Sequence, residues 1–410
     1  MKKILIVDYI VGGGFAEEDL PLDRLSEGYS ILRSCIQQFS QLGFQVSTLI
    51  DHRLMEHIRI SPIHQFESIA SHEDFLMGIK TFADEVDYTL TSAPETKGIL
   101  KDLSSIMNNS KSTYLGSKPD SIEIAADKMK TVNLAKELGL NIPATFSPSY
   151  NNSFEKILKE VEVIGFPLIV KPIDGVGCLG LTKVTNPDEL SFGLQYANSV
   201  TNMENCLVQE FIEGIPISTS LLVNGENVYP ISINHQNLRM DSKKSIGHYL
   251  GGQVPYDIPE LRNKILKTAV KLVEQMDLSG YIGVDFIATK EDVFVIEVNP
   301  RITVPFIAIN NIASSNVSSQ LISIVEKGKI DNPIKLNGYA SFSKITIPST
   351  IKNLSKYEKV AIIDGVLSPP FPLGNNTHSY ALILGIGPTV EHARKDFQRI
   401  KNELLFNLSS

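Results

Sequence analysis

The first third of the chain alternates between short apolar runs and helical spacing. Segments 3–10, 44–51 and 86–94 read as buried strands because their apolar residues are nearly uninterrupted. Between the first two, residues 28–43 carry apolar side chains at helical spacing and end at Gly43. This strand–helix–strand order predicts an α/β domain with a small open parallel sheet and crossover helices.

After a turn-rich break at 116–120, the pattern predicts a helix over 125–140 and then strands over 165–172 and 204–212. Asn224-Gly225 lies between two alternating runs, which is a strong hairpin signal.

Two further strands are expected over 280–289 and 293–301, and from about residue 336 two more strands precede a helix that begins near Thr389. We therefore expect three regions. They are a parallel-sheet domain over 1–117, a two-lobed domain over 118–335 whose small lobe covers about 143–214, and an α+β region over 336–410.

Composition narrows the function classes. The net charge is −8, from 38 Lys plus Arg and 46 Asp plus Glu, so nonspecific binding to nucleic acid or anionic membranes is not expected. The three cysteines, Cys35, Cys178 and Cys206, are too few and too far apart for a disulfide framework or a thiolate zinc site. Because no apolar run is long enough to span a membrane and no signal peptide is visible, we expect a cytoplasmic protein.

The segment 283–301 carries the strongest chemical signal. Glu297, Asn299 and Arg301 alternate, so a strand would place them on one face. If residues 290–292 form the loop, Asp285 lies directly opposite Glu297. Opposed carboxylates repel unless a divalent cation joins them, and oxygen ligands without His or Cys indicate Mg²⁺ or Mn²⁺. The alternative is a solvated face on which Arg301 pairs with the acids.

A lysine followed by a glycine-rich loop indicates phosphate binding. Lys171 ends a predicted strand, and Gly175, Gly177 and Gly180 follow it. Glycines let backbone N–H groups approach phosphate oxygens, while the lysine supplies positive charge. The alternative is a structural glycine-rich hairpin.

The end of the strand over 204–212 is a weaker candidate for a nucleotide contact. It could offer backbone hydrogen bonds to a purine and a carboxylate to ribose, through the consecutive residues Gln209, Glu210, Phe211, Ile212 and Glu213. Surface carboxylates at a strand end would look the same.

In this order, the motifs resemble those of the ATP-grasp ligases. The resemblance covers roughly 1–335, and the segments VDYIVGGG, SEGYSILRS and QEFIEGIPIS…EVNPRIT look most like archaeal-type tyramine–glutamate ligases and their relatives. It implies an ATP-grasp fold, in which an N-terminal parallel-sheet domain precedes two α+β lobes that clamp ATP. The small C-terminal α+β subdomain is similar to the last subdomain of carboxylase-like members.

The resemblance also assigns roles to residues. Lys128 and Lys171 are then the nucleotide-contacting lysines, the glycine loop is the flap, and residues 209–212 form the adenine hinge. Glu213 would contact ribose, because Ile215-Pro216-Ile217 replaces an acidic residue found in many members. Asp285, Glu297 and Asn299 would hold the metal.

The implied activity is an ATP-dependent carboxylate–amine ligase that forms an amide through an acyl phosphate and releases ADP and phosphate. Lys171 and Arg301 would be catalytic, Arg301 by holding the acyl-phosphate oxygens. The substrates would be a small carboxylate and an amine, with glutamate or a similar amino acid as a candidate, and a homodimer is compatible with the sequence. The alternatives are an ATP-dependent carboxylase component that activates bicarbonate and a noncatalytic nucleotide-binding regulator.

Substrate contacts are expected at the C-terminal ends of the first-domain strands and around the predicted metal strands. The candidates are Gly13, Glu27, Tyr29, His235, Gly251, Gly252 and Thr303. Glu27 could bind a substrate ammonium, or it could merely support the first turn of the 28–42 helix. The histidine could equally be structural.

Overall fold

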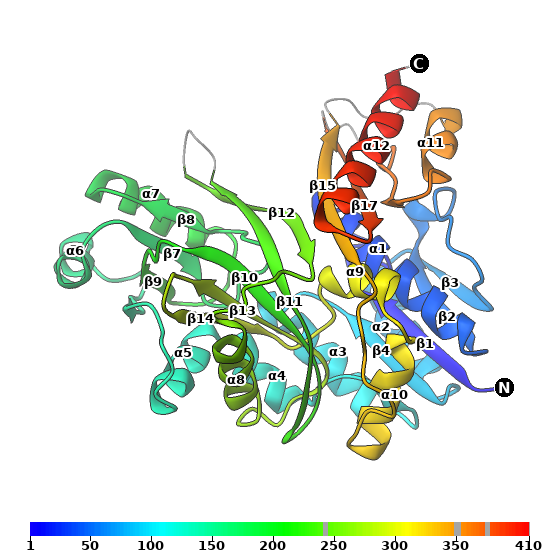
Figure 1. The fold of residues 1–410 in the computed structure, drawn as a ribbon, viewed down its shortest axis with the longest axis horizontal. Helices are drawn as coiled ribbons and strands as arrows, with labels where there is room; N and C mark the ends of the chain where they lie inside the picture. Colours follow the sequence, from blue (N-terminus) through cyan, green and yellow to red (C-terminus); the bar gives the residue numbers. More distant parts are fainter. Residues whose placement is uncertain (241–244, 348–353, 374–377, 410) are drawn as a thin grey trace.

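The computed structural model describes residues 1–240, 245–347, 354–373 and 378–409. Within these ranges, no helix is both long enough and apolar enough to cross a membrane. Figure 1 shows the parallel sheet on one side of the molecule, the small lobe on the other, and a larger antiparallel sheet between them.

The N-terminal sheet is parallel throughout, as predicted, with strand order β3-β2-β1-β4-β5. Its strands are β1 (Lys3–Asp8), β2 (Gln45–Asp51), β3 (Gln65–Ile69), β4 (Tyr88–Ser92) and β5 (Thr113–Tyr114). The sequence pattern missed β3, because it is an edge strand whose first four residues are exposed and which has no continuous apolar run.

Helices cover both faces of this sheet. They are α1 (Leu22–Gln41), α2 (His72–Ala83) and α3 (Ile99–Asn108), with 3₁₀ turns at η1 (His52–Leu54) and η2 (Thr96–Gly98). The predicted start of α1 is wrong by six residues, since Leu22 and Leu25 already face the core. Glu27 therefore lies in the second turn of α1 and does not support the first one.

The single helix expected over 125–140 is wrong as well. It is split into α4 (Pro119–Ala126) and α5 (Lys128–Glu137) by Asp127, whose backbone is extended. The Asp127 carboxylate accepts hydrogen bonds from the backbone N–H groups of Met129 and Lys130, so it caps α5. The break makes Lys128 the first residue of a new helix.

The small lobe contains a four-stranded sheet of order β6-β9-β7-β8. Its elements are β6 (Thr145–Phe146), α6 (Phe154–Ile164), β7 (Leu168–Pro172), β8 (Thr182–Val184), α7 (Pro187–Asn198) and β9 (Cys206–Glu210). The predicted glycine loop joins β7 to β8, so it projects from the edge of this sheet.

The central sheet has eight strands in the order β14-β13-β10-β11-β12-β15-β17-β16. The strands are β10 (Ile215–Asn224), β11 (Asn227–Met240), β12 (Gly247–Val254), β13 (Ser279–Ala288), β14 (Val293–Asn299), β15 (Tyr339–Ile347), β16 (Val366–Ser368) and β17 (Ser379–Gly387). The hairpin predicted at Asn224-Gly225 is confirmed, since Asn224 pairs with Asn227. The sheet is continuous across the expected boundary at residue 336, because β12 pairs with β15.

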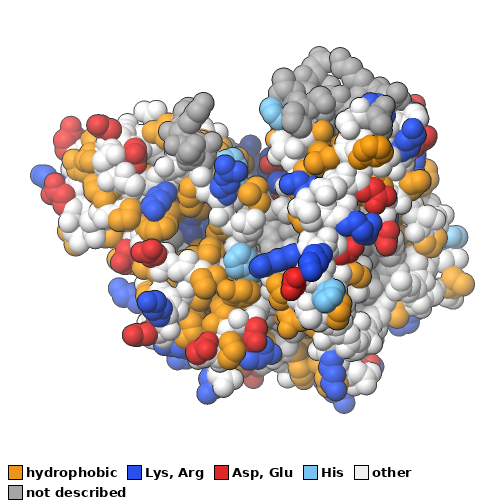
Figure 2. All heavy atoms as spheres, turned by 45° about the horizontal axis from the view of Figure 1, so that its top comes forward, with side chains coloured by type: hydrophobic (Ala, Val, Ile, Leu, Met, Phe, Trp, Pro, Cys, Tyr) orange, Lys and Arg blue, Asp and Glu red, His pale blue; other side chains and the backbone are white. Residues whose placement is uncertain are grey.

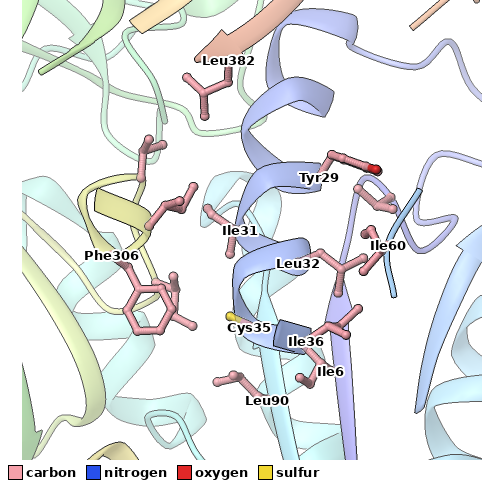
Figure 3. Packing of buried hydrophobic residues seen from close by; sticks show 14 of the residues in the cluster. Ile6, Tyr29, Ile31, Leu32, Cys35, Ile36, Ile60, Leu90, Phe306 and Leu382 are labelled. Carbon is pink, nitrogen blue, oxygen red and sulfur yellow. The ribbon is translucent and has the colours of Figure 1, made fainter. Parts of the chain in front are cut away.

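The remaining helices are α8 (Arg262–Val273), α9 (Pro305–Ile312), α10 (Val317–Lys327), α11 (Leu354–Ala361) and α12 (Val390–Ser409). One hydrophobic core joins all three predicted regions around α1. Figure 3 shows Ile31 and Leu32 of α1 among Ile6 of β1, Phe306 of α9 and Leu382 of β17. The parallel-sheet domain is therefore packed firmly against the rest of the chain.

Candidate active site

A cavity of about 160 Å³ lies where the glycine loop faces β13, β14 and α1. Figure 2 shows the molecular surface hollowed between its two sides, with Lys and Arg side chains along the hollow. The structure brings ten of the predicted site residues to this cavity: Glu27, Lys128, Lys171, Gly175, Gly177, Asp285, Glu297, Asn299, Arg301 and Thr303. They come from regions that are far apart in the sequence.

The side chain of Lys128, on α5, contacts both the glycine loop and β14. Its ammonium donates a hydrogen bond of 2.6 Å to the carbonyl of Gly175 in the glycine loop. The same Nζ lies 3.3 Å from Oε2 of Glu297 on β14. Lys128 thus holds the base of the loop close to the carboxylates.

Lys171 is buried at the end of β7. Burial lowers the pKa of its ammonium to about 8, although the nearby Glu297 acts in the opposite direction. Downstream, Gly177 has φ of +59° with open space beside it, so glycine there is required by the turn rather than by crowding. The buried cation and the loop amides face the same cavity.

Asp285 lies directly opposite Glu297, as predicted, but the route to this register differs. The loop holds residues 289–292, since Ala288 pairs with Val293, and a β-bulge at Ile296 then restores the pairing. The bulge lets Val295 point into the core while Glu297 faces the cavity. Alternation alone could not have produced both orientations.

The pKa values of the two carboxyl groups are shifted in opposite directions. Burial and then the neighbouring Glu297 raise the pKa of Asp285. For Glu297, the effect of burial is outweighed by Lys128 and Lys171, so its pKa is lowered. Gln236 also hydrogen-bonds Asp285, and Asn299 donates its Nδ2 to the same carboxylate at 3.2 Å.

This donor set fits a hard divalent cation, which would relieve the repulsion between the two carboxylates. Within the described ranges, no group of three or more His, Cys, Asp or Glu side chains is placed to hold a metal. Two carboxylates and an amide therefore leave most coordination positions to oxygen atoms from other sources, such as phosphates and water.

Arg301 lies beyond the end of β14, which stops at Asn299, so the expectation that it continues the strand is wrong. Its Nε is 3.0 Å from each carboxylate oxygen of Glu95, and its Nη1 donates to the carbonyl of Ile302. Burial alone would lower the pKa of Arg301, but Glu95 raises it. Glu95 was missed in the sequence, although it follows the predicted strand over 86–94.

Glu27, on α1 of the N-terminal domain, also lines the cavity. Its Oε1 is 2.9 Å from Nζ of Lys344 on β15, and Oδ2 of Asp23 lies 4.0 Å from the same nitrogen. Two carboxylates around one ammonium leave a net negative charge there. Lys344 was not identified from the sequence, because no neighbouring motif distinguishes it from the other lysines of the chain.

The predicted adenine hinge does not line this cavity. Nε2 of Gln209 donates to Oγ1 of Thr145, and Oε2 of Glu210 accepts from the backbone N–H of Ala144. The ring of Phe211 lies beneath Lys183, whose Nζ is 3.6 Å from the ring centroid. Ile212 is half-buried and Glu213 is exposed. Nucleotide contacts at 209–213 remain a prediction.

Several expected substrate residues lie elsewhere. Tyr29 is fully buried in the core around α1, where its hydroxyl accepts from the backbone N–H of Arg59, and the buried Gly13 packs on Ile69 of β3. His235 packs on the ring of Tyr256. These three do not line the cavity.

Three of the expected glycines are also absent from the cavity lining. At Gly251 and Gly252, an added Cβ would lie 2.2 Å from the carbonyl oxygen of Phe342 and 2.1 Å from that of His235. At Gly180 it would lie 2.7 Å from Val200. The first two glycines are therefore explained by close strand packing rather than by a ligand.

Comparisons with known sequences agree on one family. The family described as "ATP-grasp domain" matches residues 125–305, and "pre ATP-grasp 3 domain" matches residues 44–122. The chain is 30% identical over 308 residues to a tyramine–L-glutamate ligase of Methanocaldococcus fervens, covering 73% of this chain and 87% of that relative.

Two solved structures share the fold. An ATP-grasp superfamily protein from Archaeoglobus fulgidus is 19% identical with a TM-score of 0.60, covering 93% of this chain and 99% of that one. Biotin carboxylase from Campylobacter jejuni is 16% identical with a TM-score of 0.73, covering 100% and 94%. The second likeness covers the whole chain, including the C-terminal region over 336–410.

Proposed function

Because this chain belongs to the ATP-grasp superfamily and is an ATP-dependent carboxylate–amine ligase, we propose that its cavity activates the carboxylate of an amino acid and joins it to a small amine. The observation that carries this proposal is the meeting of two lysines, a carboxylate–amide set and a half-buried arginine in one cavity. The relative from M. fervens is named for tyramine and L-glutamate. Glutamate is therefore the first acid to test, and arylalkylamines are the first amines.

At the nucleotide end, Lys128 and Lys171 would neutralise phosphate oxygens, and the loop around Gly175 and Gly177 would donate backbone N–H groups to them. Asp285, Glu297 and Asn299 would hold Mg²⁺ or Mn²⁺, which supplies charge neutralisation at the phosphates. The phosphate charge must be neutralised because an anionic carboxylate has to approach an anionic phosphoryl group.

In the first step, a carboxylate oxygen of the acid attacks the γ-phosphorus. The bond between that phosphorus and the bridging oxygen breaks, and ADP leaves. Arg301 would hold the acyl-phosphate oxygens, since Glu95 fixes its Nε and leaves Nη2 without a hydrogen-bond partner among the described residues.

In the second step, the amine nitrogen attacks the acyl carbon, phosphate leaves, and the nitrogen loses a proton. The net negative charge at Glu27, Asp23 and Lys344 would attract the amine as its ammonium form before this step. Glu27 is the member of this group that lines the cavity.

The test is a phosphate-release screen with ATP and Mg²⁺ across amino acids and amines, with mass spectrometry of the product. We expect release that requires both an acid and an amine, together with a new amide. The Glu297→Gln variant serves as the matched control for contaminating ATPase. Release stimulated by bicarbonate without any amine would instead support the carboxylase alternative, and nucleotide binding without turnover for any pair would support a regulator.

A further inference from the structure

The loop between β4 and α3, residues 94–98, touches both the base of the glycine loop and Arg301. On one side, Asp174 at the base of the glycine loop is almost fully buried. Its Oδ2 accepts from the backbone N–H of Lys97 at 2.9 Å, and its carbonyl accepts from Oγ1 of Thr96 at 2.9 Å. The loop that would cover phosphate is thus fastened to the N-terminal domain by two hydrogen bonds.

On the other side, the same loop carries Glu95, whose two carboxylate oxygens each lie 3.0 Å from Nε of Arg301. Only one residue separates Glu95 from Lys97 along the chain. A shift of the backbone at Lys97 therefore moves the group that orients Arg301.

The backbone of this connection is strained. Lys97 has φ of 59° and ψ of 19°, a left-handed conformation that costs a non-glycine residue about 1–2 kcal/mol. Such a conformation persists where neighbouring contacts hold it, and the contacts to Lys97 and Thr96 come from Asp174. When the glycine loop lifts, those contacts are lost and the segment can relax.

We propose that Asp174 is a positioning residue that links closure of the glycine loop over nucleotide to the orientation of Arg301, through Thr96, Lys97 and Glu95. The proposal rests on the nucleotide and acyl-phosphate roles given above. Bound nucleotide and an ordered Arg301 favour one another, and linkage makes the effect reciprocal. The acyl-phosphate arginine is then fully oriented only when ATP is enclosed, which limits unproductive contact with the acid.

The linkage can be measured without knowing the acid. Cys178 lies inside the glycine loop, so its alkylation rate reports loop opening, and titration with Mg²⁺ and the unreactive analogue AMP-PNP gives an apparent Kd. We expect Asp174→Ala to raise this Kd about tenfold and Glu95→Gln to raise it about threefold, within the usual range of coupling between sites. The double variant should match Asp174→Ala alone, because Asp174→Ala already removes the side-chain bond to Lys97 through which the two sites are linked.

Matched controls separate linkage from simple packing. Asp174→Asn keeps one acceptor for Lys97, so it should stay close to the unchanged protein in Kd. Thr201→Val removes the 2.6 Å bond that Thr201 donates to Oδ1 of Asp174 from the small-lobe side, while leaving the contacts to residues 96–97, and it should preserve the response to Glu95→Gln.

Additive effects of Asp174→Ala and Glu95→Gln, or a Kd that Glu95→Gln leaves unchanged, would overturn the linkage while the proposed ligase function stands. If AMP-PNP fails to protect Cys178 in the unchanged protein, the nucleotide site itself is misassigned, and the proposed function and the linkage both fall.

Discussion

The two ends of the cavity hold their charges in different ways. At the proposed nucleotide end, Lys128 pairs with Glu297, but Asp285 faces Glu297 directly and the buried Lys171 has a lowered pKa. At the other end, the charges are already paired, Arg301 with Glu95 and Lys344 with Glu27. Like charges held together are costly unless a ligand joins them, whereas paired charges fix geometry in advance. We therefore propose that ligands complete the first end and that the second end orients them.

This contrast is tested most strongly by neutralising one carboxylate at the nucleotide end. We expect Glu297→Gln to lower kcat about a thousandfold, because a charge that would hold the metal against the phosphates is lost. Stability should change little, because the relief of repulsion from Asp285 is offset by the loss of the ion pair with Lys128. Steady-state kinetics and thermal unfolding measure the two effects. Full activity at ordinary Mg²⁺ would remove Glu297 from the metal site.

The same substitution at the other end should behave differently. Glu95→Gln leaves the half-buried Arg301 without the charge of its buried partner, so we expect the free energy of unfolding to fall by about 3 kcal/mol. Urea denaturation of this variant beside Glu297→Gln gives a direct comparison. Equal stability of the two variants would contradict the view that the proposed substrate end depends more strongly on internal pairing.

A smaller effect is expected at Glu27. Glu27→Gln should raise KM for the amine about tenfold, or ~1.4 kcal/mol, and leave KM for ATP nearly unchanged. The control is the double variant Glu27→Gln with Lys344→Gln, which removes both charges of the pair. If Glu27 only ties α1 to β15, the double variant should recover the amine KM. If it binds ammonium, the defect should persist.

The smallest effect concerns the glycine loop. Cys178 is half-buried in the glycine loop, and burial raises the pKa of its thiol to about 12, so its reaction with iodoacetamide should be sensitive to movement of the loop. We expect ATP with Mg²⁺ to slow this reaction roughly threefold by favouring the closed loop. The buried Cys35 in α1 provides an internal control whose rate should not respond. An unchanged rate at Cys178 would contradict the assignment of this loop to phosphate binding.

The nucleotide end was largely predictable from the sequence, because its groups lie on strands and loops with local signals. The alternation of polar residues from Glu297, the acid on the preceding strand, and a lysine followed by glycines can each be recognised within a segment of about 20 residues. Glu95 and Lys344 could not be recognised in this way, since their roles depend on contacts across 206 and 317 positions of sequence. The bulge at Ile296 was also hidden, because it leaves the Asp285–Glu297 pairing intact.

The elements of the fold were likewise predictable where a local sequence pattern marks them. Buried strands and the Asn224 hairpin were predicted from local patterns, whereas the edge strand β3 carries no apolar run to reveal it. The break at Asp127 was missed because apolar spacing continues through it, and only the cap geometry shows that a new helix begins.

The core around α1 has a consequence for how the chain can be divided. Since Ile6, Phe306 and Leu382 share that core, the three regions should melt in one cooperative transition rather than as separate units. A truncated protein ending near residue 335 would uncover apolar surface on α1 and α9, and would be expected to aggregate. A chimaera that exchanges the N-terminal domain must therefore also exchange the residues of α9 and β17 that pack on α1.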